Sequence, residues 1–482
     1  MISPAPGAAP AAAPDEPPPP ETPLPRTPFQ WRLGIAGGVL AVGTVAYMLH
    51  EPLGYRFQAA CGIVCFLGVA ALFSNSLQSV SRKTLLWGIA LQFALAAAVI
   101  YSPQVRGVFE VVGDAIKALI TASDKGADFV FGPLAKSVSP PSTAVGAAGG
   151  GPMMAAELER NPPQPFIFAF RALPPIIFVS SFFSVLYYLG VLQFFVRIMA
   201  RAMQYMMGTS GAETLSVSAN VFMGQTEAPL IVKPFVPRMT RSELLALMAS
   251  GMAHISGGMM AVYISYGADP VAILSTCVMA CPCALYLTKL VYPEAGKPAT
   301  AGETPITVET PYVNAVDAAA AGVKDGLLLA MNVAAMLIAF IAFIALFDII
   351  LGGFFTGLTL QKIFAVLFSP VAFLLGVDPS ECDKVGALLG IKLAANEHVA
   401  YLTLGGKLPG SHEFTELSQR SKLLAVYALT GFANFASVGI QLGGIGAIAP
   451  GRRADLARLG MKALFVGFLA TLINAAVAGL LM

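Results

Sequence analysis

Two acidic residues lie in stretches of this 482-residue chain that are otherwise strongly apolar. Glu227 follows Gln225, and Glu397 follows Asn396. A carboxylate accepts hydrogen bonds from hydroxyl and N–H groups, and an ionisable side chain at membrane depth is costly enough to indicate a functional site. Together with Gln225 and Asn434, the two carboxylates fit a neutral solute that carries several hydroxyls or a heterocycle. An anionic solute would need a buried arginine or a helix N-terminus, and no arginine lies near either glutamate.

The sequences that follow the two glutamates resemble each other. Residues 241–246 (RSELLA) match residues 420–425 (RSKLLA), and residues 251–254 (GMAH) match residues 431–434 (GFAN) when one residue near Leu429 is treated as an insertion. Each half therefore has a carboxylate followed by an apolar segment with a polar residue at its middle. Interrupted hydrophobic segments at corresponding places in two halves of a chain are the best sequence indication of a transporter's binding site.

Several polar and aromatic residues accompany this repeat. Asn434 and Ser437 are three residues apart and would share one helix face. Phe432 is either part of the same site or lipid-facing bulk. His254 corresponds to Asn434 in the repeat, and it is either a hydrogen-bonded helix contact or a group that titrates near physiological pH. His398 raises the same question.

The composition excludes several classes of protein. The chain is 56% hydrophobic and only 12% charged, with a mean hydropathy of +0.73, whereas a soluble domain is about a quarter charged. A soluble enzyme is therefore not expected. The net charge of +2 offers no basic excess for a nucleic acid partner. A phosphate-binding G-x-x-x-x-G-K-[ST] sequence, a nucleophile triad and a metal-ligand cluster are all missing, so we expect no ATP-driven transport. The six cysteines lie mostly in apolar runs and are interpreted as packing residues.

A membrane span needs roughly 20 mostly apolar residues. Nine segments qualify, at about 33–49, 57–74, 84–101, 172–190, 241–266, 271–291, 327–351, 422–446 and 461–482. Amphipathic stretches at 105–135, 191–207 and 359–377 are expected at the bilayer surface or on the outside of the bundle. Residues 137–165 have the composition of a flexible loop, and the Pro- and Ala-rich residues 1–28 that of a disordered tail.

Lysine and arginine predict the orientation. With nine spans and a cytoplasmic N-terminus, five basic clusters fall on the cytoplasmic side and the C-terminus lies outside. The polar stretches at about 208–236 and 380–410 would then be re-entrant hairpins that enter from the cytoplasm and from outside, with tips that meet near the midplane. Irregular backbone at that depth persists only against protein or a watery cavity. The alternative is two ordinary extramembrane loops, which apolar neighbours such as Val221 and Leu230 disfavour. The expected fold class is an all-α polytopic membrane protein with about nine transmembrane helices, two re-entrant helical hairpins of inverted-repeat character, and interfacial helices.

These residues resemble a known family, the concentrative nucleoside transporters, which include bacterial nucleoside:cation symporters. The resemblance extends over roughly residues 57–482, and the span at 33–49 with the preceding tail looks like an addition. Its motifs occur in order at residues 208–213 (GTSGAE), 219–220 (AN), 224–230 (GQTEAPL), 239–244 (MTRSEL), 396–397 with 399–401, and 431–435 (GFANF).

The resemblance implies a homotrimer in which each protomer has a scaffold part and a transport part, the latter built from two re-entrant hairpins and partly unwound helices. The first hairpin would contact the nucleobase, and the second hairpin with the following helix would hold the ribose. The residues implied on the base side are Gln225, Thr226 and Glu227 with Phe432 near the base, and on the ribose side Glu397, Asn434 and Ser437.

The resemblance also implies a coupling-ion site between the first hairpin and the next helix. Its positions are Asn220, Met223, His254 and Ile255, where Met223 and Ile255 would contribute only backbone carbonyls. Position 254 usually carries a small hydroxyl residue, and an imidazole offers no oxygen to a hard cation such as sodium. A protonated His254 that hydrogen-bonds to Asn220 would replace the sodium charge. Coupling to a proton or to sodium is therefore left open, with the histidine favouring the proton. His398 stands where a phenylalanine usually follows the glutamate.

The expected function is uptake of nucleosides by symport with a proton or sodium, without enzymatic activity or a cofactor, across a bacterial inner (plasma) membrane. Two alternatives remain: a transporter-like sensor that binds without moving solute, and a symporter for another small neutral polar solute. The predicted organisation is a tail at 1–30, an additional helix at 31–56, scaffold and interfacial helices at 57–207, the first hairpin with following helices at 208–292, a loop, scaffold helix and interfacial helix at 293–379, the second hairpin with its following helix at 380–446, and a final scaffold helix at 447–482.

Overall fold

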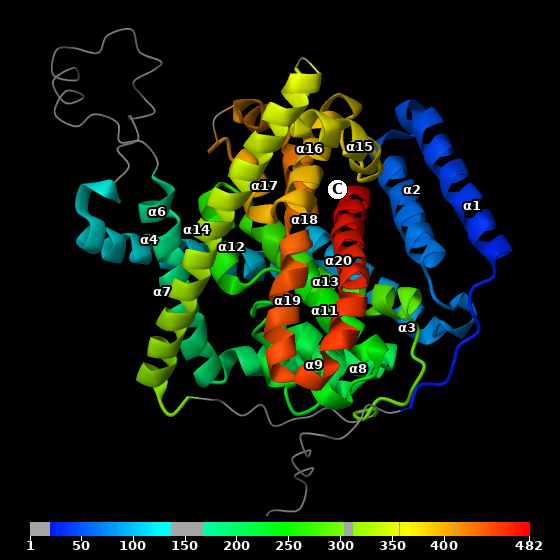
Figure 1. Cartoon of the computed structure of the whole chain (residues 1–482), viewed down its shortest axis with the longest axis horizontal. Coiled ribbons are helices and arrows are strands. Elements are labelled where there is room, and N and C mark those ends of the chain that lie inside the picture. Colours follow the sequence, from blue (N-terminus) through cyan, green and yellow to red (C-terminus); the bar gives the residue numbers. More distant parts are fainter. Residues whose placement is uncertain (1–19, 136–166, 303–311, 356, 409) are drawn as a thin grey trace, which may run out of the picture.

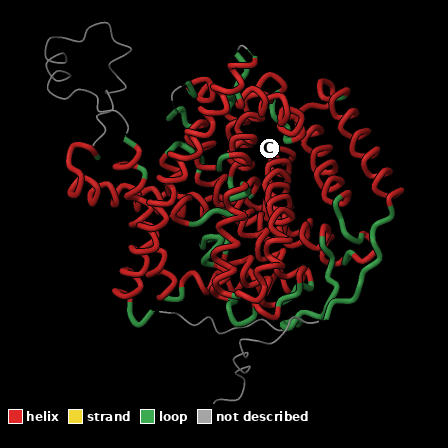
Figure 2. The backbone as a smooth tube through the Cα atoms, viewed as in Figure 1, coloured by secondary structure: helices red, strands yellow, loops and turns green. Residues whose placement is uncertain are grey.

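The described part of the protein is a bundle of helices, as Figure 2 shows. The computed structural model describes residues 20–135, 167–302, 312–355, 357–408 and 410–482, and every regular element in these ranges is helical. The predicted loop at 137–165 lies outside them. The helical structure of the described ranges and the high mean hydropathy of the chain confirm the prediction of an all-α polytopic membrane protein.

Within the described ranges, eight helical segments are long and apolar enough to cross a membrane. They are α1 Phe29–Met48, α2 His50–Leu72, α3 Arg82–Tyr101, α6 Phe168–Arg171 with α7 Leu173–Tyr188, α11 Arg241–Ala253 with α12 Gly257–Ser265, α13 Pro270–Val291, α14 Ala315–Phe354, and η6 Pro450–Arg452 with α20 Arg453–Leu481.

Two of the nine predicted spans are interrupted helices. The segment predicted at 422–446 is divided into α18 Gln419–Leu429 and α19 Phe435–Ile448, and the segment predicted at 241–266 is divided into α11 and α12. The second half of each pair begins at a new capping residue, Ser256 for α12 and Asn434 for α19, whose side chain accepts a backbone N–H of the first turn. Average hydropathy does not respond to such a cap, so hydropathy alone treats each pair as one span, whereas the family resemblance implies the partly unwound helices that the structure has.

Helices at the centre and at the edge of the bundle differ in burial. The central α11, α13 and α20 pack against one another and are almost entirely buried. By contrast, α1 packs along α2, α14 packs along α7, and both α1 and α14 leave most of their apolar side chains exposed at the periphery (Figure 1). In a membrane such faces are covered by lipid or by other protein.

The three predicted amphipathic stretches are helices. They are α4 Pro103–Phe131, α8 Val191–Met207 and α15 Leu360–Leu374. Each packs one face on the bundle, α4 on α7 and α13, α8 on α9 and α3, and α15 on α16. The structure thus confirms helices on the outside of the bundle.

The N-terminal tail is partly ordered. Residues 20–28 run in an extended conformation along the end of the bundle at which α1 begins (Figure 1). The backbone N–H of Thr22 donates to the Ala295 carbonyl at 2.9 Å, and the Thr27 hydroxyl donates to the Ser74 carbonyl at 3.1 Å. The prediction of a disordered tail was therefore wrong for this segment, because loop carbonyls of distant residues hold a sequence that could not fold alone. The rest of the tail lies outside the described residues.

Two helical hairpins approach the centre from opposite ends. The first comprises α9 Gly211–Ala219, α10 Ala228–Ile231 and η3 Val236–Arg238, and the second comprises η4 Pro379–Glu381, α16 Cys382–Ala394, α17 Glu397–Leu404 and η5 His412–Glu416. In Figure 1, α9 lies at the lower end of the bundle, and α16 and α17 lie in its upper half. Ser216, Ser218 and Asn220 are buried, which excludes an exposed loop for the first hairpin.

A buried polar network fixes the start of the first hairpin. Ser210 caps α9 and Thr240 caps α11, each in a reciprocal pair with the glutamate three residues later, Glu213 and Glu243. The hydroxyl of Ser210 also donates to the Glu243 carboxylate. Lys289, near the end of α13, lies 2.8 Å from the Glu213 carboxylate. One ammonium group thus joins the beginnings of two helices to the end of a third.

The six cysteines are all free and buried. Their interpretation as packing residues is confirmed.

Candidate functional site

Glu397 is the first residue of α17 and is held by two side chains from other helices. The Tyr263 hydroxyl of α12 donates to Oε1 at 2.8 Å, and the Asn434 amide, at the cap of α19, donates to Oε2 at 2.8 Å. The carboxylate is buried. The Tyr401 ring stacks on Tyr263 with a centroid distance of 4.2 Å, so the tyrosine that holds Glu397 is itself fixed.

Gln225 connects the tip of the first hairpin to the same helix, α19. Its amide donates to the Ser437 hydroxyl at 3.3 Å, and its carbonyl oxygen accepts from the Gln441 amide at 3.1 Å. The backbone N–H of Ser437 donates in turn to the side-chain oxygen of Asn434 at 2.9 Å. A continuous chain of polar contacts therefore runs from the first hairpin along α19 to Glu397 of the second.

Three other predicted residues lie outside this chain of contacts, Thr226 and Glu227 in the first hairpin and Phe432 between α18 and α19. The Glu227 carboxylate accepts the backbone N–H of Gly224 at 3.1 Å. The Thr226 side chain approaches α19 so closely that a methyl group on Gly444 would lie 2.6 Å from it. Phe432 is partly buried in the break between α18 and α19.

The two helix breaks contact each other directly. The backbone N–H of Phe432 donates to the His254 carbonyl at 3.1 Å, which joins the break after α18 to the break after α11. Gly431 has a φ of +140°, a conformation that side chains rarely adopt. A methyl group there would also lie 2.9 Å from the Met252 carbonyl oxygen. The close approach between the α18–α19 break and the end of α11 therefore requires glycine at position 431.

The four predicted ion-site residues surround the junction between the first hairpin and the first break. Asn220 ends α9, and its amide donates to the Ser250 hydroxyl at 2.6 Å and to the Ser216 carbonyl at 3.2 Å. The side-chain oxygen of Asn220 is buried and has no hydrogen-bond partner among the described residues. Met223 follows in the hairpin tip, and Ile255 lies buried in the break.

His254 does not contact Asn220 as predicted. Its Nδ1 donates to the Ser250 carbonyl at 2.7 Å, one helical turn earlier, and its Nε2 lies 3.3 Å from the Cys281 sulfur on α13. The predicted hydrogen bond is wrong because the last turn of α11 directs the ring toward α13. These contacts are those of a neutral imidazole, one nitrogen donating and the other accepting from a thiol.

His398 lies against aromatic rings. Its Nε2 is 3.1 Å from the Tyr266 hydroxyl, and its ring makes edge contacts with Phe168, Tyr263 and Tyr266. It therefore supports the helix that carries Glu397 through packing.

Three residues near the site were not predicted to belong to it. Gln441 lies four residues after Ser437 on one helix face, a spacing that could have indicated it. Tyr263 gives no such signal, because only the fold brings it to Glu397. Lys392 is fully buried, and its ammonium donates to the Ala428 carbonyl at 2.7 Å and to the hydroxyl of Thr471 at 2.9 Å.

Comparisons with known proteins match most of the chain. Three family profiles fit consecutive regions: "Na+ dependent nucleoside transporter N-terminus" at residues 61–134, "Nucleoside recognition" at 169–270, and "Na+ dependent nucleoside transporter C-terminus" at 272–479. The chain belongs to the concentrative, Na⁺-dependent nucleoside transporter family. As a member of that family it is a multi-pass membrane transporter and not an enzyme, as the sequence predicted.

Relatives of this transporter are found in bacteria and mammals. An uncharacterized transporter of Haemophilus influenzae is 39% identical over 425 residues, which cover 87% of this chain and 96% of the relative. The mouse sodium/nucleoside cotransporter 1 is 38% identical over 436 residues, which cover 87% of this chain and 63% of the longer mouse protein.

Solved structures of the transporter CNTnw have the same fold. The structure in an inward-facing substrate-bound state aligns with a TM-score of 0.78 at 37% identity, and covers 89% of this chain and 98% of that chain. A variant of CNTnw in an outward-facing state aligns with a TM-score of 0.77 at 36% identity, over 88% of this chain and 97% of that chain.

Proposed function

We propose that this family member takes up nucleosides by symport with sodium, and that the nucleoside binds where the two hairpin tips meet α19. The observation that supports the site is the chain of contacts from Gln225 through Ser437 and Asn434 to Glu397. This chain of contacts brings hydrogen-bond donors and acceptors from both hairpins into one buried place. A polar solute at membrane depth needs such partners, because no lipid group can replace them.

The chemistry of the tips divides into two sides. Glu397 and Asn434, with Ser437, form the ribose side, because a carboxylate retains acceptor sites for two hydroxyls after accepting one bond at each oxygen. The base side comprises Gln225, Thr226, Glu227 and Phe432, whose amide, hydroxyl, carboxyl and ring suit a planar heterocycle with N–H and C=O groups.

Nucleotides are not expected as substrates. Lys392 is the buried cation nearest Glu397 in sequence, and its ammonium already donates to Ala428 and Thr471. A phosphate brought to the tips would lose its hydration without a paired cation, which is prohibitively costly. A nucleoside monophosphate should therefore compete far more weakly than the nucleoside.

Sodium is the proposed coupling ion, bound at Asn220, Met223, His254 and Ile255. The unpartnered buried oxygen of Asn220 is the kind of ligand that a hard cation prefers, and the other three residues would offer backbone carbonyls. His254 would act through its carbonyl alone, because both ring nitrogens are engaged by Ser250 and Cys281. This interpretation replaces the proton carrier that the histidine favoured at the level of sequence.

Assembly and orientation are part of the proposal. The exposed apolar face of α14 suits contact with other protomers in a homotrimer. The extended segment 20–28, here called the N-terminal strap, and the C-terminus lie toward opposite ends of the bundle (Figure 1), so the two termini are proposed on opposite sides of a bacterial inner membrane, with the N-terminus cytoplasmic and the C-terminus outside.

Uptake by the purified full-length chain in proteoliposomes tests the function. Radiolabelled uridine should accumulate above its external concentration when an inward sodium gradient is imposed, and not when choline replaces sodium at constant pH. A proton gradient alone should drive no accumulation. Saturable binding without accumulation under either gradient would instead support a sensor, and accumulation driven only by protons would contradict sodium coupling.

A further inference from the structure

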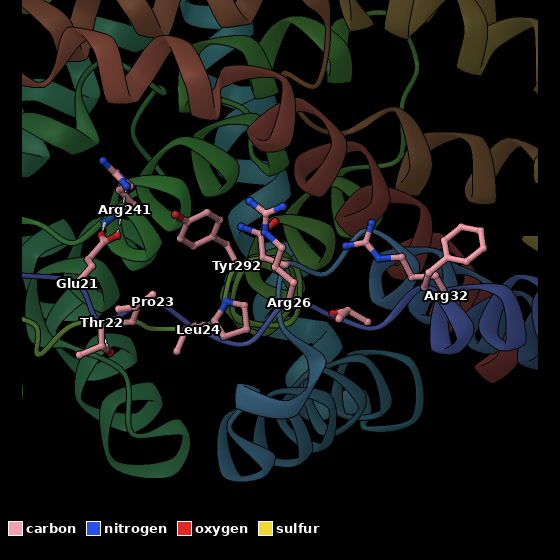
Figure 3. Close-up of a pocket in the computed structure, with 13 residues that line it drawn as sticks. Glu21, Thr22, Pro23, Leu24, Arg26, Arg32, Arg241 and Tyr292 are labelled. Carbon is pink, nitrogen blue, oxygen red and sulfur yellow. Dashed lines mark hydrogen bonds and ion pairs between the residues drawn. The ribbon is translucent and has the colours of Figure 1, made fainter.

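A cavity lies beside the extended N-terminal segment, and its lining includes none of the residues of the proposed nucleoside site. It has a volume of about 720 Å³, is open on one side, and lies between the extended segment 20–28, the turn after α2, the end of α13 and the start of α11. Figure 3 shows its lining residues. Helices α1, α11 and α20 begin at this end of the bundle, and α2 and α13 end there. The cavity therefore lies at the level where spans leave the hydrocarbon, which is the level of lipid headgroups.

The cavity carries positive charge that the protein does not neutralise. Arg241 is paired with Glu21 at 3.6 Å and with Asp455 at 3.1 Å. Arg26 is exposed and makes no hydrogen bond or ion pair within the described ranges. The Nη2 of Arg32 donates to the Ser74 carbonyl at 3.1 Å, while its buried Nε has no partner among the described residues. Two guanidinium groups thus keep unused donors and uncompensated charge.

One side of the cavity is the turn around Asn75, which hydrogen bonds hold in place. The N–H of Asn75 donates to the Val291 carbonyl at 2.9 Å, and its carbonyl accepts the N–H of Thr27 at 3.1 Å. Its side-chain oxygen accepts from Lys462 at 3.1 Å, and the ammonium of Lys462 lies 4.9 Å from the centre of the Tyr292 ring. These bonds hold the Lys462 ammonium against Asn75 and Tyr292, two residues that line the cavity.

The adjacent surface is apolar. Phe29 and Trp31, in the first turn of α1, are 77% and 51% exposed, and Leu33 follows at 64%. Aromatic side chains concentrate where a span meets the membrane surface. A ligand that binds here would meet guanidinium groups at one end and an exposed apolar helix at the other.

We propose that this cavity binds an anionic phospholipid, with its phosphate on Arg26 and Arg32 and its acyl chains along α1. Arginine pairs with phosphate through two parallel hydrogen bonds, and the exposed side of α1 suits hydrocarbon. The phosphate chemistry is shared with soluble phosphate esters, but only a lipid uses both the charged cavity and the apolar helix. Because the extended segment also contacts α11 through Glu21, a bound lipid would fasten the N-terminal addition to the central helices.

Lipid binding can be measured on the purified full-length chain by native mass spectrometry during titration with phosphatidylglycerol or with phosphatidylcholine of the same acyl chains. Each basic residue near an anionic lipid surface contributes about 1 kcal/mol, so two should favour phosphatidylglycerol by about tenfold or more. The variants Arg26→Gln and Arg26→Gln/Arg32→Gln should reduce that preference stepwise to about twofold or less. Arg453→Gln, which removes an exposed charge at the same end but outside the cavity, should leave it unchanged.

The single variant protects the test against misfolding, because Arg26 holds no other group in place. Equal affinity for the two lipids in the unmodified protein would overturn the proposal. A preference that persists in Arg26→Gln/Arg32→Gln, or that falls equally in Arg453→Gln, would also overturn it. A competition experiment with inorganic phosphate distinguishes a lipid from a soluble anion. If millimolar phosphate displaced phosphatidylglycerol, the site would be one for a soluble anion and not for a lipid.

Discussion

Glu397 shows how a buried carboxylate can be held in place and still accept new partners. Each of its oxygens accepts one short bond, from Tyr263 and from Asn434. An ionised carboxylate has about four acceptor positions, so two remain for the ribose hydroxyls of the proposed substrate. Both donors come from segments that begin at helix breaks, which makes the position of Glu397 depend on the interrupted helices as well as on its own hairpin.

The variant Glu397→Gln should therefore lose uptake. One carboxylate oxygen becomes an NH₂ donor and the negative charge is lost, and a buried acceptor lost in this way costs about 1–3 kcal/mol, more for a charged group. We expect uridine uptake to fall by at least about tenfold, since 1.4 kcal/mol is a factor of ten. The control Glu416→Gln makes the same change at an exposed position. Wild-type accumulation by Glu397→Gln in proteoliposomes would show that the site is elsewhere.

Asn220 offers a test of ion binding at a single atom. Asn220→Ala removes the unpartnered oxygen, and we expect the sodium concentration for half-maximal uptake to rise by about tenfold, with a smaller change in the nucleoside KM at saturating sodium. Ser250→Ala is the matched control, because it removes the same hydrogen bond and leaves the oxygen of Asn220 in place. If both variants shifted the sodium dependence equally, the oxygen would have no role as a ligand.

At the scale of elements, the first hairpin depends on charges at its base. Lys289 is buried, and it contacts Glu213 at 2.8 Å, Glu294 at 3.0 Å and the Ser242 hydroxyl at 3.0 Å. Glu243 lies in the same network through Ser210. Removal of one partner of a buried ion pair costs more than the pair contributes, because it leaves uncompensated charge.

Lys289→Met should accordingly destabilise the protein by about 3–5 kcal/mol. In a thermal unfolding assay in detergent, the midpoint should fall by several degrees, and the loss should be smaller when Glu213→Gln is introduced together with it. Lys297→Met makes the same replacement at an exposed position in the following loop and should leave the midpoint unchanged. An unchanged midpoint for Lys289→Met would mean that the hairpin base is held by other contacts.

The sequence predicts elements better than it predicts where side chains point. Hydropathy locates the spans, and the repeat between residues 241–254 and 420–434 locates both hairpins and the middle of both interrupted helices. Asn434 is found because its motif occurs twice. The direction of the His254 ring could not be predicted in this way, because it depends on a contact with Cys281, which is 27 residues away in another helix. Tyr263 is missed for the same reason, because its contact with Glu397 exists only in the fold.

For the whole molecule, the two ends of the bundle are formed by different segments of the chain. The end with the N-terminal strap carries the base of the first hairpin, and the opposite end carries the base of the second and the C-terminus (Figure 1). Basic residues lie at the strap end, where α3 begins at Arg82, η3 ends at Arg238 and α20 begins at Arg453. By the positive-inside rule we propose that this end faces the cytoplasm.

Cysteine labelling tests this orientation directly, because the six native cysteines are buried and give little background. Lys297→Cys places a thiol at an exposed position near the strap, and Glu413→Cys places one at an exposed position in η5 of the second hairpin. An impermeant maleimide added to intact cells should modify Glu413→Cys and should modify Lys297→Cys only after the membrane is permeabilised. The unmodified protein, treated in the same way, should remain unlabelled. The reverse pattern would place the N-terminus outside, and labelling of both variants in intact cells would contradict the assignment of the two ends to opposite sides of the membrane.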